Sequence, residues 1–109
     1  MKTEKPGMAI VTVPVDAARA IAKAVVQSRL AACAQVTSKV RSVYWWKGRM
    51  EEADERLVIL KTEKSHVGAL RKLLRGVHPY EVPELVFLPI TAGNPDYLAW
   101  LSEALVKKI

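Results

Sequence analysis

The chain has 109 residues, half of them apolar, and carries a formal net charge of +6. This length suits one small domain with a single modest core, and we expect no second domain. The basic residues are spread over most of the chain, so we interpret them as a solvated surface and expect no nucleic-acid partner. No apolar stretch approaches the roughly 20 residues that cross a bilayer, which excludes a membrane span.

The single cysteine and the N-terminal residues indicate the cellular compartment. Cys33 has no second cysteine with which to form an internal disulfide, and a lone thiol fits a reducing environment. The first residues include Lys2, Glu4 and Lys5, and the short apolar run after them ends at Pro14 without a small-residue cleavage pattern. We therefore expect no secretory signal and a cytoplasmic protein.

The first expected elements are a strand and an amphipathic helix. Residues 8–13 are rich in isoleucine and valine and stop at Pro14, which is typical of a buried strand. Asp16 is placed to cap the following helix. Apolar residues recur there at helical spacing, namely Ala18, Ile21, Ala22 and Val25. The pattern predicts a helix that covers one face of a sheet.

A long hairpin is expected next. Residues 32–46 are of β type, the pair Lys47-Gly48 fits a two-residue turn, and residues 49–62 return as the partner strand. Each arm is longer than the usual strand of about 5 or 6 residues. We expect an irregularity near Thr37 and Ser38 to split the first arm. The outer part of the hairpin still needs a partner, which predicts assembly with other subunits.

The second half of the chain predicts a helix and a short strand. Ser65 is placed to cap a helix that ends at Gly76. The residues expected on its inner face are Val67, Leu70, Leu73 and Leu74. Residues 85–90 form the last strand, and the prolines at both of its ends favour a position at the edge of the sheet.

The C-terminal segment predicts a third helix. Asn94-Pro95-Asp96 combines a cap, a proline at the first helical position and an acid in the first turn. Leu98, Leu101 and Leu105 are expected on its inner side, and Lys107 and Lys108 suit its negative end. The whole order is βαββαβ with an extra C-terminal helix. It predicts an α/β (α+β) domain of ferredoxin-like type, with an antiparallel sheet and two helices on one face.

Several functions of this architecture are excluded by residue identity. The strand at 8–13 has no aromatic residue for stacking RNA bases, and the loop after it has no cysteine pair for copper transfer. The chain also has no glycine-rich phosphate loop and no spacing that suggests a Ser-His-acid set. We therefore expect a protein that is not an enzyme and has no catalytic residue.

The segment His78-Pro79-Tyr80-Glu81-Val82-Pro83-Glu84 is the main candidate site. It places an imidazole and two carboxylates close together, and such ligands suit a borderline divalent ion. The alternative interpretation is structural: the prolines stiffen a connection, Tyr80 anchors it, and the acids remain hydrated. Spacing alone favours this second interpretation.

The chain resembles the CutA (divalent-cation tolerance) family from about residue 8 to residue 105. The resemblance is carried by Leu30-Ala31-Ala32-Cys33, Ser42-Val43-Tyr44-Trp45-Trp46-Lys47-Gly48, Leu60-Lys61-Thr62, the segment 78–84, and Gly93-Asn94-Pro95-Asp96-Tyr97-Leu98-Ala99-Trp100. Residues 1–7 lie outside it and are expected to be a variable extension, whereas residues 8–109 form the single domain. The resemblance implies a ferredoxin-like subunit in a tight homotrimer, with an architecture like that of the PII signalling trimers.

The resemblance also implies site residues. His78 matches the histidine of the family and is the first candidate ligand for Cu(II) or another divalent cation, followed by Glu81 and Glu84. Cys33 matches the cysteine of the family and is a further candidate, although its alanine-rich surroundings favour packing. Some relatives have a cysteine and a second histidine where this chain has Val11 and Val77. The aromatic residues Tyr44, Trp45 and Trp46 are expected at a subunit junction, with Tyr80 beside them in the cleft.

Two other functions follow from the same resemblance. A PII-like signalling trimer would hold a small anionic ligand between subunits, with Lys61, Lys47 and Arg49 lining the cleft. A rigid trimeric scaffold would need no ligand. The leading hypothesis is a trimeric protein that binds divalent metal ions and responds to them, with no organic cofactor.

Overall fold

The computed structural model describes residues 5–106, which form one antiparallel sheet and three α-helices. The elements are β1 (Pro6–Pro14), α1 (Ala18–Gln27), β2 (Cys33–Val36), β3 (Val40–Trp46), β4 (Arg49–Glu63), α2 (Val67–Val77), β5 (Val86–Pro89) and α3 (Pro95–Ala104). The strand order is β2-β4-β1-β5, and β3 pairs with β4 beyond β2. This arrangement confirms the predicted ferredoxin-like fold with an extra C-terminal helix.

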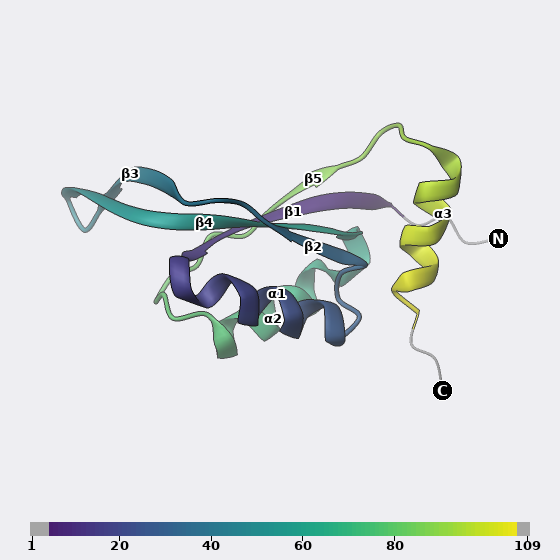
Figure 1. Ribbon diagram of the computed structural model, residues 1–109, viewed down its shortest axis with the longest axis horizontal. Coiled ribbons are helices and arrows are strands. Elements are labelled where there is room, and N and C mark those ends of the chain that lie inside the picture. The colour runs from purple at the N-terminus through teal and green to yellow at the C-terminus, as the bar shows by residue number, and fades with distance from the viewer. Residues whose placement is uncertain (1–4, 107–109) are drawn as a thin grey trace.

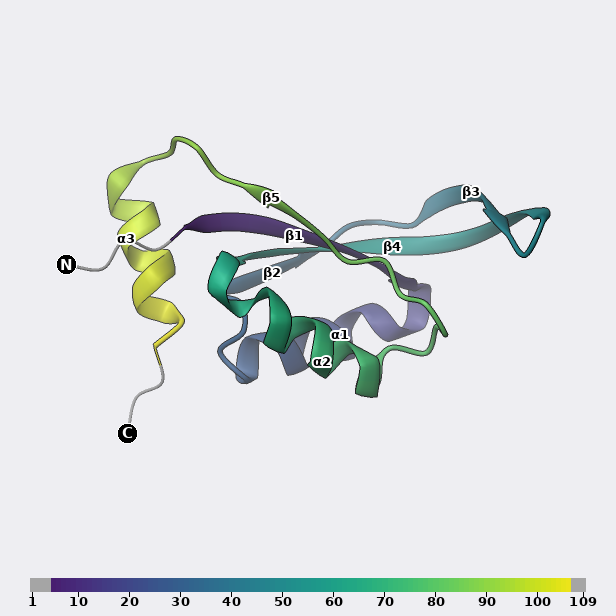
Figure 2. The same cartoon turned by 180° about the vertical axis from the view of Figure 1, so that it is seen from behind.

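The two central strands place their apolar residues against the helices. Along β1, alternate residues are buried, and Ala9 and Val11 lie opposite Leu60 and Val58 of β4. The helices α1 and α2 cover this face, and α3 stands at one end of the sheet (Figures 1 and 2). The core also contains the predicted helix residues Ile21, Val25, Leu70 and Leu74. No helix in residues 5–106 is long and apolar enough to cross a membrane.

The hairpin formed by β3 and the first part of β4 projects from the domain at the end opposite α3 (Figure 1). Lys47 and Gly48 make its turn with φ of 53° and 77°, which confirms the predicted two-residue turn. The predicted interruption of the first arm is confirmed between β2 and β3. There, the backbone N–H of Thr37 donates to the backbone oxygen of Leu57 at 3.0 Å, and Thr37 Oγ1 accepts from the backbone N–H of Leu57 at 2.9 Å.

The predicted caps of the first two helices are wrong. Asp16 lies inside a single turn of 3-10 helix, Val15–Ala17, and Ala17 is the cap residue of α1. Ser65 lies likewise inside the turn Lys64–His66, and its hydroxyl contacts Nδ1 of His66 instead of a helix N–H. The reason is the same at both sites. Each strand enters its helix through an extra tight turn, which moves the start of the helix beyond the polar residue.

The end of α2 also differs from the prediction. Gly76 is helical, the helix continues to Val77, and His78 leaves it in an extended conformation with φ −82° and ψ 133°. By contrast, the start of α3 is confirmed, because Asn94 Oδ1 accepts a hydrogen bond from the N–H of Asp96 at 3.0 Å. Leu101 and Leu105 are buried as expected. The predicted helix-end residues Lys107 and Lys108 lie outside the described residues.

Candidate functional site

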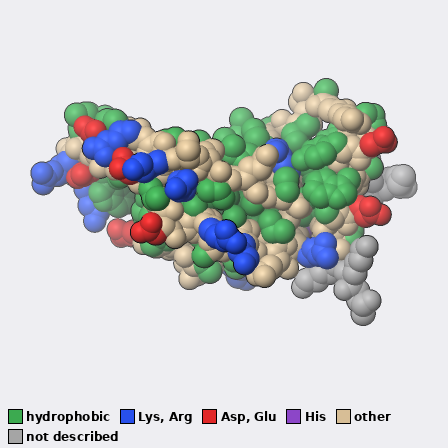
Figure 3. Space-filling model, in the orientation of Figure 1, with side chains coloured by type: hydrophobic (Ala, Val, Ile, Leu, Met, Phe, Trp, Pro, Cys, Tyr) green, Lys and Arg blue, Asp and Glu red, His purple; other side chains and the backbone are tan. Residues whose placement is uncertain are grey.

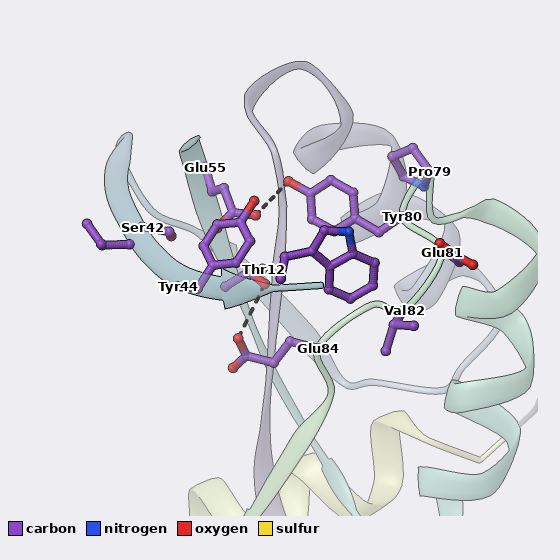
Figure 4. A pocket seen from close by; sticks show the side chains of 11 residues that line it. Thr12, Ser42, Tyr44, Glu55, Pro79, Tyr80, Glu81, Val82 and Glu84 are labelled. Carbon is purple, nitrogen blue, oxygen red and sulfur yellow. Dashed lines mark hydrogen bonds between the residues drawn. The ribbon is translucent and has the colours of Figure 1, made fainter. Parts of the chain in front are cut away.

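A cavity of about 680 Å³ lies where the hairpin meets the segment that follows α2 (Figure 4). Its walls come from β1, β3, β4 and the loop before β5, so residues far apart in sequence meet there. The lining residues are Thr12, Ser42, Val43, Tyr44, Trp46, Glu55, Pro79, Tyr80, Glu81, Val82 and Glu84. They include three carboxylates and no lysine or arginine, which gives the cavity an acidic character in a chain of net charge +6.

His78 is buried, with 7% of its surface exposed, and it holds the segment against the sheet. The backbone N–H of Tyr80 donates to its Nδ1 at 3.1 Å, and Nε2 lies 2.8 Å from the backbone oxygen of Thr12. Because Nδ1 accepts a hydrogen bond, the proton of the neutral ring is on Nε2, which donates to Thr12. Both ring nitrogens are therefore engaged within the protein. A metal ion could bind to this ring only after one of these bonds breaks.

Glu55 and Tyr80 form the inner wall of the cavity. The Tyr80 hydroxyl donates to Glu55 Oε2 at 2.5 Å, and Glu55 is 5% exposed. Burial raises the pKa of the Tyr80 phenol, and the hydrogen bond to the Glu55 carboxylate raises it further. The phenol thus remains a donor to Glu55 beyond the pH at which an ordinary tyrosine ionises.

This raised pKa predicts a pH dependence of stability. An unfolded tyrosine ionises near pH 10, while the folded Tyr80 keeps its proton to a higher pH. The stability contributed by Tyr80 is therefore complete below about pH 10 and is lost as the pH rises above it. Denaturant unfolding between pH 8 and pH 11 is expected to show a fall in stability that is smaller in Tyr80→Phe. Equal falls in both proteins would contradict the prediction.

Glu81 and Glu84 lie at the open side of the cavity. Glu84 accepts a hydrogen bond from the Thr12 hydroxyl at 3.3 Å (Figure 4). Glu81 pairs with Lys47 of the hairpin turn at 3.8 Å, and both of these side chains are exposed. Such exposed pairs contribute at most about 1 kcal/mol. These two carboxylates are therefore available to other ligands.

Cys33 and Lys61 lie elsewhere on the sheet. They are cross-strand partners in β2 and β4, whereas the partner of Thr12, next to His78, is Leu57. Cys33 Sγ is 3.9 Å from the Tyr97 hydroxyl. No group of three His, Cys, Asp or Glu side chains in residues 5–106 has the geometry of a metal site. The structure thus does not bring the four predicted ligands together within one chain.

The basic residues expected around an anionic ligand do not line the cavity either. Lys61 Nζ donates to Gln35 at 2.8 Å on the sheet, away from the acidic lining. Lys47 lies at the hairpin turn with its ammonium 5.6 Å from the centre of the Trp46 ring, and Arg49 follows it at the start of β4. Of the expected cleft aromatics, Tyr44, Trp46 and Tyr80 line the cavity, while Trp45 does not.

Four lining residues were not predicted as site residues from the sequence, namely Thr12, Ser42, Val43 and Glu55. Glu55 stands in a charged run from Glu51 to Arg56, and charged residues of this kind are mostly exposed in proteins. The hairpin register pairs Tyr44 with Glu51, so every second residue of β4, including Glu55, lies on the side of Tyr44. Counting this register from the predicted Lys47-Gly48 turn could therefore have placed Glu55 on the same side of the hairpin as Tyr44.

The fold and the site define a ferredoxin-like α/β domain whose projecting hairpin borders an acid-lined cavity. The family model described as CutA1 divalent ion tolerance protein matches residues 8–104. This match covers most of the chain, and the protein belongs to the CutA1 divalent ion tolerance family.

Individual relatives agree with this assignment. The divalent-cation tolerance protein CutA of Thermus thermophilus is 44% identical over 95 residues, which are 86% of this chain and 92% of that protein. Protein CutA of Mus musculus is 48% identical over 96 residues, which are 87% of this chain but 54% of the mouse protein. The chain therefore spans about half the length of this mammalian relative. The crystal structure of CutA1 from Oryza sativa superposes with a TM-score of 0.91 at 36% identity, over 97% of this chain and 98% of the other.

Proposed function

We propose that this protein works in the tolerance of divalent metal ions, as a homotrimer that binds such an ion at the outer edge of the acidic cavity. The observation that carries this proposal is the family match over residues 8–104. It is supported by a bacterial relative of nearly the same length, 44% identical, that is named a divalent-cation tolerance protein. Neither observation involves a catalytic group. The proposed role is to bind a divalent metal ion and to respond to it.

Glu81 and Glu84 are the proposed ligands of the ion. Both are exposed on one short segment, and their oxygens suit Cu(II) or another divalent cation. His78 holds the segment in place through its bonds to Thr12 and Tyr80, so its proposed role is structural. Because one subunit supplies too few ligands, we infer that a neighbouring subunit completes the site.

The hairpin supplies the proposed subunit contact. On the face of the hairpin away from the cavity, Trp45 and Met50 are cross-strand partners and are 74% and 64% exposed. Figure 3 shows hydrophobic side chains at the surface both on the hairpin and around α3. Contiguous exposed apolar groups of this kind mark protein–protein contacts.

Isothermal titration of Cu(II), and then Zn(II), into the purified protein tests the ion site. We expect saturable binding that is strongly weakened in the double variant Glu81→Gln, Glu84→Gln and retained in Glu103→Gln, which changes an exposed acid on α3. Absence of binding by a trimer of confirmed mass would contradict metal binding and favour the scaffold function. The acidic lining argues against the PII-like signalling function, because three carboxylates would repel an anionic ligand.

A further inference from the structure

The inner part of the cavity has an electrostatic feature that metal tolerance does not explain. Glu55 is 5% exposed and lines the cavity. Among the described residues, its carboxylate accepts a side-chain hydrogen bond from a neutral group, the Tyr80 hydroxyl. No lysine or arginine of residues 5–106 forms an ion pair with it. Burial removes water from a carboxylate. When no cation is near, a single hydrogen bond from a hydroxyl compensates for only part of that lost hydration. A cationic ligand would supply the missing partner.

The surroundings of Glu55 are aromatic. Tyr44, Trp46 and Tyr80 line the same cavity, and Figure 4 shows the Tyr80 hydroxyl directed at the Glu55 carboxylate. The faces of such rings attract alkylammonium ions within about 6 Å of the ring centre. At the rim of the cavity, an ammonium group of the chain itself already lies beside an aromatic ring and a carboxylate. Lys47 Nζ lies 5.6 Å from the centre of the Trp46 ring and 3.8 Å from Glu81.

The same groups fit an organic cation better than a metal ion. A metal ion needs several converging ligand atoms, and residues 5–106 contain no group of three suitable side chains. An ammonium ion needs only one carboxylate and apolar or aromatic contact for its alkyl part. The volume of about 680 Å³ lies within the range of small-molecule sites, about 300–1,000 Å³.

From this geometry we propose that the cavity binds an organic ammonium ion, with its charged nitrogen against Glu55 and its alkyl groups against Tyr44, Trp46 and Tyr80. This site lies deeper than the exposed carboxylates Glu81 and Glu84. It does not depend on the metal site proposed there.

The test is an NMR titration of the 15N-labelled full chain with choline and with n-butylammonium, in the presence of EDTA. The chelator makes the result independent of metal binding. The neutral isostere of choline, 3,3-dimethylbutan-1-ol, is titrated in parallel. We expect saturable shifts of the Trp46 indole N–H and of the amides of Tyr80, Glu81, Val82 and Glu84 with at least one of the two cations, and not with the alcohol.

Glu55→Gln is the decisive variant, because glutamine can still accept the hydrogen bond of Tyr80 but carries no charge. It is expected to weaken binding of the cation at least about tenfold, which corresponds to about 1.4 kcal/mol. Glu103→Gln, on α3, is the matched control and should bind as the wild type does. Equal binding of the alcohol, unchanged binding by Glu55→Gln, or no binding of either cation would overturn the proposal.

A second variant keeps the proposal testable if Glu55→Gln does not fold. Trp46→Leu removes one aromatic face but leaves the cavity wall apolar. It is expected to weaken binding of the cation severalfold, since the ring contributes a cation–π contact. Unchanged affinity in this variant would also overturn the proposal.

Discussion

Trp45→Glu is expected to convert the proposed trimer into folded monomers of 12.1 kDa. The indole is 74% exposed in the single subunit and lies beside Met50 on the hairpin, outside the core and outside the cavity. A buried aromatic residue at the centre of an interface commonly contributes 2 kcal/mol or more to association. A glutamate there would also bury an unpaired charge on assembly. The chain should still fold, because Trp45 is not part of the hydrophobic core.

Light scattering coupled to size exclusion measures this effect, and circular dichroism checks the fold. Gln27→Glu adds the same charge at the exposed end of α1 and serves as the control, which is expected to remain trimeric. A trimeric Trp45→Glu variant would show that the hairpin tip is not the subunit contact. Monomeric wild-type protein would contradict the proposed assembly as a whole.

The predictable part of the fold is the part that local patterns specify. The burial of Ile21, Val25, Leu70 and Leu74 follows from helical spacing, and the turn at Lys47-Gly48 follows from the tolerance of glycine for positive φ. These features depend on neighbours in sequence. The sequence therefore contains the information that is needed to place them.

The features that the sequence did not predict depend on geometry between elements. A 3-10 turn before each of the first two helices displaced the caps from Asp16 and Ser65, because the way in which a strand enters its helix decides the cap position. The site depends on still longer separations. His78 bonds to a residue 66 positions away, and Tyr80 bonds to Glu55 across 25 positions. No local pattern indicates such contacts, and the sequence alone therefore leaves two interpretations of the segment 78–84 open, a metal site and a stiffened connection.

His78→Ala is expected to lower the free energy of unfolding by about 2–4 kcal/mol. The substitution removes a buried ring together with the partners of the Tyr80 N–H and the Thr12 carbonyl. It also releases the segment that positions Tyr80, Glu81 and Glu84. Denaturant unfolding at a fixed protein concentration measures the loss, since the stability of an oligomer depends on concentration.

His66→Ala is the matched control, because this half-buried ring lies in the turn before α2 and its described side-chain bond is to the neighbouring Ser65. It is expected to change stability by less than about 1 kcal/mol. Copper titration then separates the two roles of His78. If the histidine is structural, the folded His78→Ala protein should lose stability and still bind copper, at a lower affinity, because its carboxylates remain on a less firmly held segment. Loss of copper binding with unchanged stability would instead make His78 a metal ligand, and one of its two hydrogen bonds would then have to open when the ion binds.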